Sequence, residues 1–149
     1  MKKKLLACCL ALGTVLSINA QEKMKIDEKD VPVSVQTTFK GQYPEASDAG
    51  WKMKDGKYKV HFKVSGTKQI AAFDQSGTLL SKGVEVKEAD LPTAIGTSTK
   101  SLYANREIDE IYKIDKDGTT NYLVKLKGDP KTKILYSADG QVVKDKSDW

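Results

Sequence analysis

The stretch YPEASDAGWKMKDGKYKVHFKVSG, residues 43–66, decides the fold of this chain. Apolar and charged residues alternate on either side of Asp55-Gly56, and an Asp-Gly pair between two such runs is a strong β-hairpin signal. Because successive side chains of a strand point to opposite faces, the large apolar residues share the buried face: Trp51, Met53, Tyr58, Val60, Phe62 and Val64. The basic residues share the opposite face: Lys52, Lys54, Lys59, His61 and Lys63.

The segments that precede the strands repeat along the chain. DVPVSVQTTFKGQYP begins at Asp30, and DLPTAIGTSTKSLYA begins sixty residues later at Asp90. In each copy an aspartate before an early proline signals a helix start, because the carboxylate can accept from free N–H groups and proline needs no donor there. Apolar side chains at helical spacing then predict a buried stripe: Val31, Val35, Phe39 and Tyr43 in the first copy, and Leu91, Ile95, Leu102 and Tyr103 in the second.

The strands after each predicted helix also correspond. We align Trp51 and Met53 with Tyr112 and Ile114, and the strand YKVHF at Tyr58 with YLVKL at Tyr122. A helix with one apolar stripe and a sheet with one apolar face bury each other. The sequence therefore predicts an α+β protein of two tandem α-β-β-β(-β) repeats, forming an antiparallel sheet with both helices packed on one face.

The first twenty residues read as a secretory signal. Lys2–Lys4 form a positive start, Leu5–Leu16 an apolar run, and Ala20 a plausible cleavage point. The apolar run is shorter than the roughly 20 residues that a spanning helix needs. We expect residues 1–20 to be a cleaved signal peptide, residues 21–29 a flexible lead, residues 30–88 the first repeat and residues 89–149 the second. The protein would then be periplasmic or secreted, with no transmembrane segment after cleavage.

Removal of this signal changes how the composition is read. The whole chain carries +5 at pH 7, and loss of the three signal lysines leaves +2. The pI near 9.0 is therefore largely due to the signal and gives no support for binding nucleic acid. Cys8 and Cys9 are lost with it, which excludes a disulfide, a Cys-ligated metal and a cysteine nucleophile.

Two features of the sequence imitate functional sites. His61 is the only histidine, and metal ligation needs three or four donors, so we interpret it as a strand residue facing solvent. Asp115 and Asp117 in DKDGTTN resemble the start of a calcium loop, but the position of the closing glutamate is Leu126. A hairpin turn explains Asp117-Gly118 equally well. We predict no cofactor, with calcium at Asp115 and Asp117 as the weak alternative.

The basic face of the sheet is the remaining candidate for a site. It comprises Lys52, Lys54, Lys59, His61 and Lys63, and we place Lys113, Lys125 and Lys127 in the equivalent strands of the second repeat. The simplest interpretation is a solvated face that keeps an open sheet soluble. The functional interpretation is attraction of an acidic ligand or an acidic surface of an envelope protein.

Three stretches carry a resemblance to a known family. VPVSVQTTFKGQYPEASDAGW, YKVHFKV and FDQSGTLL resemble the PepSY-like, β-lactamase-inhibitor-like proteins of bacterial periplasms, over residues 30 to about 144. The resemblance implies tandem repeats whose sheets join into one curved surface, which in the inhibitor proteins grips an enzyme. It implies no catalytic residues.

These observations favour a binding protein over an enzyme. One histidine and no cysteine outside the signal leave only carboxylate or Ser/Lys chemistry, and no paired acids stand out. We expect a non-enzymatic periplasmic or secreted module that recognises a protein partner through the basic face, with Lys52, Lys54, Lys59, His61, Lys63 and Lys125 as binding residues. The alternative is an envelope protein that responds to calcium or another small ligand.

Overall fold

The computed structural model describes residues 24–143 of the 149. The expected signal peptide, residues 1–20, lies outside the described residues. Along the chain the elements are β1 (Met24–Ile26), a 3-10 turn η1 (Glu28–Asp30), α1 (Val33–Gln42), β2 (Ser47–Lys54), β3 (Lys57–Val64), β4 (Thr67–Phe73), β5 (Leu79–Val86), a 3-10 turn η2 (Glu88–Asp90), α2 (Thr93–Leu102), β6 (Ile108–Lys116), β7 (Thr119–Leu126) and β8 (Thr132–Ser137).

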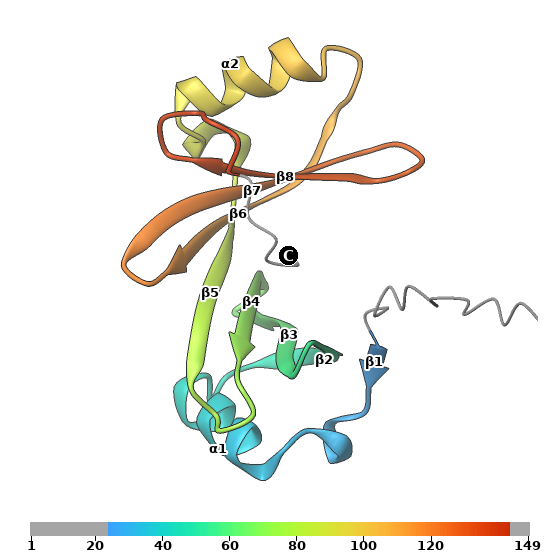
Figure 1. Ribbon diagram of the computed structural model, residues 1–149, viewed down its shortest axis with the longest axis vertical. Helices are drawn as coiled ribbons and strands as arrows, with labels where there is room; N and C mark the ends of the chain where they lie inside the picture. The colour runs from blue at the N-terminus through green and yellow to red at the C-terminus, as the bar shows by residue number, and fades with distance from the viewer. Residues whose placement is uncertain (1–23, 144–149) are drawn as a thin grey trace, which may run out of the picture.

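The strands form one antiparallel sheet in which every strand pairs with its neighbours in the sequence. Figure 1 shows α1 and α2 at opposite ends of the long axis, with β5 running between the two halves. The chain thus repeats a 3-10 turn, a helix and three strands, and β5 is the connecting fourth strand. The predicted α+β fold with two tandem repeats is confirmed.

The register of the strands places both helices on one side of the sheet. Residues paired across antiparallel strands share a face, and one row crosses the sheet through Phe62, Gln69, Val84, Lys113, Tyr122 and Tyr136. Phe62 belongs to the core under α1 and Tyr136 to the core under α2. We call this side of the sheet the helix face and the reverse side the outer face.

Each helix buries its own core against the helix face. Val35 and Phe39 of α1 pack with Trp51, Val60, Phe62, Ala71 and Phe73. Ile95 of α2 packs with Ile111, Val124, Leu126, Ile134 and Tyr136. The burial of Trp51, Val60 and Phe62 confirms the predicted register of the first hairpin.

A third apolar cluster lies on the outer face, which neither α1 nor α2 covers. Its buried members are Ile70, Tyr112, Ile114, Leu123 and Leu135. Gly83 stands between Ile70 and Ile114 in one row, and a Cβ at this glycine would collide with both isoleucine side chains. The absent side chain lets the two isoleucines meet over β5, which is consistent with a sheet that curls toward its outer face.

Three details of the predicted fold are wrong. The lead expected to be flexible contains β1, which pairs with β2. Asp30 and Asp90 do not cap the helices: each ends a 3-10 turn, and prolines 32 and 92 occupy the N-cap positions without a side-chain cap. Leu102, expected in the buried stripe of the second helix, is 58% exposed.

The repeat alignment is also shifted by one residue in β6. Trp51 pairs with Val60, and the structurally equivalent pair in the second repeat is Ile111 with Val124. Ile111 therefore corresponds to Trp51, whereas Tyr112 points to the outer face. Lys113, which the sequence placed among the outer lysines, lies on the helix face instead.

Candidate functional site

The outer face carries a cavity of about 290 Å³ between strands from both repeats. We call it the outer groove. Asp48, His61, Lys63, Lys68, Glu110, Tyr112 and Lys125 contribute to its lining. In a flat sheet β3 and β7 would stand about 19 Å apart, because strands are spaced by about 4.8 Å. His61 of β3 and Lys125 of β7 nevertheless line the same groove, so the curl of the sheet builds the site.

A carboxylate at the centre of the groove organises its cations. Glu110 accepts a hydrogen bond from Lys125 Nζ at 2.7 Å and another from Lys68 Nζ. Lys68 also lies 3.5 Å from the carboxylate of Glu85. Burial alone would raise the pKa of Glu110, but the bonds from Lys125 and Lys68 outweigh that effect and lower its pKa to about 2. These contacts hold two lysine side chains of the groove in place.

Tyr112 forms an apolar wall beside this network. Lys125 Nζ lies 4.6 Å from the centre of the Tyr112 ring, a cation–π geometry. Burial and the neighbouring carboxylate of Glu110 raise the pKa of the phenol. The groove therefore presents an uncharged aromatic side chain next to a fixed ammonium group.

β2 forms one end of the groove, and a second ion pair lies there. A bulge between residues 47 and 50 of β2 gives Asp48 a positive φ of 53°. Its carboxylate accepts a hydrogen bond from Lys63 Nζ at 2.9 Å. The bulge thus re-aims an acidic side chain toward a lysine of the adjacent strand.

The pKa of His61 reflects the positive charges around the groove. Burial, as the largest cause, and the positive charges of Lys125, Lys52, Lys59 and Lys133 together lower its pKa to about 4. The lysines that act on it come from both repeats. The predicted solvent-facing histidine is therefore partly buried and uncharged at neutral pH, in a region of positive potential.

We expect His61 to make stability depend on pH. The folded protein keeps the imidazole neutral down to about pH 4, whereas the unfolded chain protonates it near 6.5. The unfolded state thus binds more protons in this interval, so the free energy of unfolding should fall as pH drops from 6.5 to 4, by up to about 1.4 kcal/mol per pH unit. Urea denaturation should show this slope in wild type and a flatter one in His61→Gln. Equal slopes would refute it.

Of the six predicted binding residues, three line the groove and three do not. His61, Lys63 and Lys125 line the groove. Lys52 and Lys59 pair across β2 and β3 and act on His61 through their charge. Lys54 pairs with Lys57 next to the hairpin turn and does not line the groove. Lys127, also placed on the basic face, bonds Glu107 at 3.0 Å outside the groove.

The sequence did not point to the acidic and aromatic residues of the site. Glu110 and Lys68 come from strands that the prediction did not connect, and Tyr112 was assigned to the core by the shifted alignment. The one available signal was the charged Asp-Glu pair at 109 and 110, near the start of β6, where Glu110 pairs with Lys125.

The two aspartates suggested for calcium are placed by the structure. Asp115 accepts a hydrogen bond from Thr120 Oγ1 at 2.7 Å, and Asp117 occupies the hairpin turn with a positive φ of 50°. Within residues 24–143, no group of three or more His, Cys, Asp or Glu side chains is arranged to hold a metal ion. Calcium binding therefore stays a prediction of the sequence pattern.

The fold places this chain among α+β proteins that are built from two tandem repeats and share one curved sheet. The chain belongs to the beta-lactamase-inhibitor-like, PepSY-like family, whose model matches residues 17–81 and 56–144. The two overlapping matches agree with the repeat seen in the structure. A comparison with curated proteins gives no significant match.

Solved structures of the same fold come from species of Bacteroides. A protein of Bacteroides eggerthii described as periplasmic has a TM-score of 0.64 and 18% identity, over 76% of this chain and 86% of that one. A DUF2874 family protein of Bacteroides ovatus has a TM-score of 0.59 and 25% identity, over 76% and 84%. A BLIP-like protein of Bacteroides fragilis has a TM-score of 0.55 and 22% identity, over 78% and 90%. Of the helices in residues 24–143, neither has the length and apolar character to cross a bilayer.

Proposed function

We propose that this protein is a non-enzymatic binding module of the bacterial envelope that recognises an acidic surface of a protein partner through the outer groove. The observation that carries the proposal is the groove itself, in which curvature gathers His61, Lys63, Lys68 and Lys125 from three strands. The family membership and the periplasmic description of a relative with the same fold support it.

The groove is suited to binding because its side chains are already held in place. Glu110 fixes Lys68 and Lys125, and Asp48 fixes Lys63. A partner that meets ordered side chains loses less conformational entropy on association. The lysines that act on His61 leave a positive potential, which complements a carboxylate of the partner and accelerates encounter.

The titratable groups of the groove favour binding over catalysis. General acid–base catalysis works best with a pKa near the working pH. Here the pKa of His61 is lowered to about 4, that of Glu110 is lowered to about 2, and that of Tyr112 is raised. These three groups therefore do not exchange protons readily near neutral pH.

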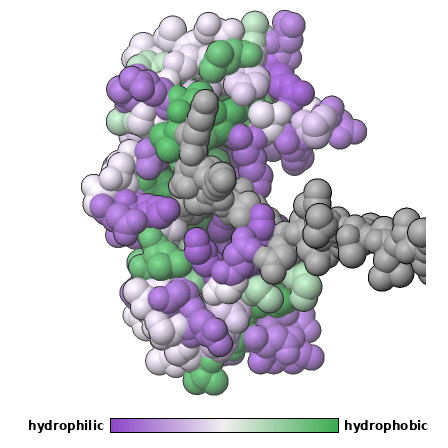
Figure 2. Space-filling view, in the orientation of Figure 1, coloured by the Kyte–Doolittle hydropathy of each residue, from purple (hydrophilic) through white to green (hydrophobic). Residues whose placement is uncertain are grey.

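A polar mode of recognition also fits the rest of the surface. The large apolar side chains exposed in the described residues lie apart on different elements: Met24, Val33, Val84, Leu102 and Val142. Figure 2 shows apolar patches separated by hydrophilic ones on the side that faces the viewer. Scattered apolar residues of this kind are ordinary surface features, not an apolar docking patch.

Capture from an envelope extract tests the proposal. We expect the immobilised protein to retain a partner, and the variant with Lys59, His61 and Lys63 changed to Glu to lose it. Retention should weaken at high salt, since exposed charges are screened over about 8 Å at physiological ionic strength. The matched control changes Lys82, Lys87 and Lys113, which are exposed away from the groove, to Glu. Equal recovery by both triple variants, or no recovery by wild type, would overturn the proposal.

A further inference from the structure

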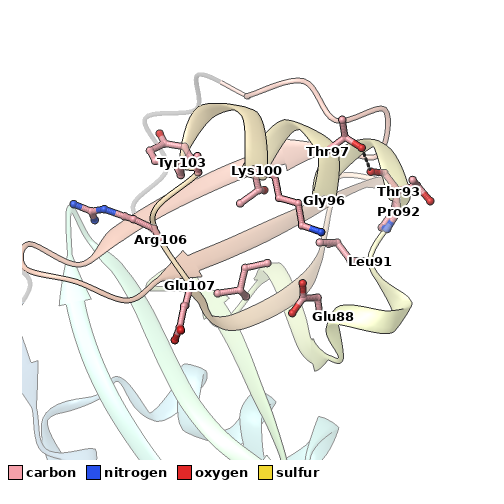
Figure 3. Close-up of a pocket in the computed structure, with 13 residues that line it drawn as sticks. Glu88, Leu91, Pro92, Thr93, Gly96, Thr97, Lys100, Tyr103, Arg106 and Glu107 are labelled. Carbon is pink, nitrogen blue, oxygen red and sulfur yellow. Dashed lines mark hydrogen bonds between the residues drawn. The ribbon is translucent and has the colours of Figure 1, made fainter.

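A second cavity, of about 580 Å³, lies beside α2 on the other side of the sheet. We call it the α2 pocket. Side chains from the η2 turn, from α2 and from the start of β6 surround it, as Figure 3 shows for Glu88, Lys100 and Tyr103. Its size falls in the range of roughly 300–1,000 Å³ that is typical of small-ligand sites. The outer groove contributes no residue to it.

The pocket exists because the second repeat lacks side chains that the first repeat has. In the first repeat Gln36 reaches back from α1 to the η1 turn and donates hydrogen bonds to the carbonyls of Glu28 and Val31, each at 2.8 Å. The equivalent residue in α2 is Gly96. A Cβ at Gly96 would meet no atom within 4 Å. The bridge between helix and turn is therefore missing in the second repeat.

The large aromatic residue of the first helix is missing as well. Phe39 is surrounded by the rings of Tyr43, Trp51, Phe62 and Phe73. Its equivalent is Thr99, because Tyr43 and Tyr103 each close their helix by donating to the carbonyl of Phe39 and of Thr99. Thr99 is buried and lines the pocket, and its hydroxyl has no hydrogen-bond partner among the described residues.

The same comparison identifies two charged side chains that have no ion-pair partner among the described residues. In the first repeat Lys40 of α1 pairs with Glu28 of the η1 turn at 2.8 Å. The equivalent residues, Lys100 and Glu88, line the α2 pocket, and neither has an ion-pair partner within residues 24–143. Figure 3 shows their side chains extending into the same region from the helix and from the turn. The other two charged side chains of the pocket make hydrogen bonds: Arg106 Nη1 donates to Thr132 Oγ1 at 2.6 Å and to the carbonyl of Pro130, and Glu107 accepts from Lys127 Nζ.

We propose that the α2 pocket binds a small zwitterion of the α-amino-acid type with a large apolar side chain. Lys100 would bind the carboxylate of the ligand, and Glu88 would bind its ammonium group. These two contacts would take the place of the Lys40–Glu28 ion pair of the first repeat. The side chain would enter the space that Gln36 and Phe39 fill in the first repeat, against Leu91 and Ile108. A ligand of this class supplies both charges and the missing apolar volume.

Calorimetric titration of the purified chain with L-phenylalanine tests this site. We expect saturable binding, and at least about tenfold weaker binding of 3-phenylpropionate and of phenethylamine, because each lacks one charged group and a charge-assisted hydrogen bond contributes about 1.5–3 kcal/mol. Lys100→Met and Glu88→Gln should weaken L-phenylalanine binding by at least the same factor. Lys40→Met removes the equivalent lysine of the first repeat and should leave the affinity unchanged.

A filled pocket provides the opposite control. The double variant Gly96→Gln, Thr99→Phe restores the side chains of the first repeat and should abolish binding. A circular dichroism spectrum and a melting temperature establish that this variant is folded, and the single Lys100→Met exchange tests the same site if it is not. The proposal is overturned if wild type gives no saturable heat up to about 20 mM L-phenylalanine, or if Lys100→Met and Lys40→Met bind it equally well.

Discussion

Replacing Phe39 with alanine should lower the free energy of unfolding by about 3–5 kcal/mol, the usual cost of truncating a buried phenylalanine. Phe39 is 5% exposed, and its ring centre lies 5.1 Å from that of Phe62 and 5.2 Å from that of Trp51. Both contacts are edge-on, the favoured arrangement for aromatic pairs. Urea denaturation, with the midpoint and slope fitted together, measures the change.

Thr99→Ala is the matched control for this prediction. It removes side-chain atoms at the equivalent position of the second helix, but the lost hydroxyl has no hydrogen-bond partner among residues 24–143, and alanine is the better helix former. We expect a change in the free energy of unfolding within about 1 kcal/mol. Equal destabilisation by the two substitutions would show that the two cores do not differ as described.

Gly77→Ala should destabilise the protein by about 2–5 kcal/mol, for two separate reasons. Gly77 has a φ of +91°, which L-residues adopt at a cost of about 1–2 kcal/mol. A Cβ at this position would also lie 2.7 Å from the carbonyl oxygen of Ser34 in α1. The contact is with backbone, so relief would require the helix to move away from the turn.

Gly56→Ala measures the cost of the positive φ without the cost of a steric clash. Gly56 has a φ of +70°, but a Cβ there would meet no atom within 4 Å. This substitution should therefore cost only the conformational part, about 1–2 kcal/mol. Thermal and urea melts of both variants give the comparison. If Gly77→Ala is no more destabilising than Gly56→Ala, the close approach between α1 and the turn after β4 is wrong.

The first hairpin was predictable because its pattern allows one register. Trp51, Val60 and Phe62 alternate with lysines and a histidine, and a shift of one residue would bury those charges. The repeat of Asp-x-Pro and of tyrosine sixty residues later gave the second helix its position. These local signals were sufficient for the element order and for the side of the sheet that each helix covers.

The second repeat was harder because β6 is apolar on both faces. Ile111 is buried under α2, while Tyr112 and Ile114 are buried on the outer face, so the sequence Ile-Tyr-Lys-Ile shows no clear alternation. The shifted alignment followed from this pattern. It assigned Tyr112 to the helix face, so the aromatic wall of the outer groove was not predicted.

The groove could not be read from the sequence for a different reason. It depends on the curl of the sheet, which brings β3 close to β7 and allows Lys68 of β4 to reach Glu110 of β6. Contacts between strands that are not neighbours arise from three-dimensional curvature and leave no spacing pattern in the chain. Lys63 and Lys125 were identified from the sequence, but Lys68 and the carboxylates of Asp48 and Glu110 that hold these lysines were not.

The approach of β3 to β7 is the central claim, and the titration of His61 tests it most directly. His61 is the only histidine, so its imidazole signals in an NMR titration are unambiguous. We predict a pKa of about 4 in wild type and a higher one in Lys125→Met, with no change in Lys113→Met. In a flat sheet Lys125 would act over about 19 Å, well beyond the screening length of about 8 Å. A wild-type pKa near 6.5 that Lys125→Met leaves unchanged would contradict the curved sheet and the groove.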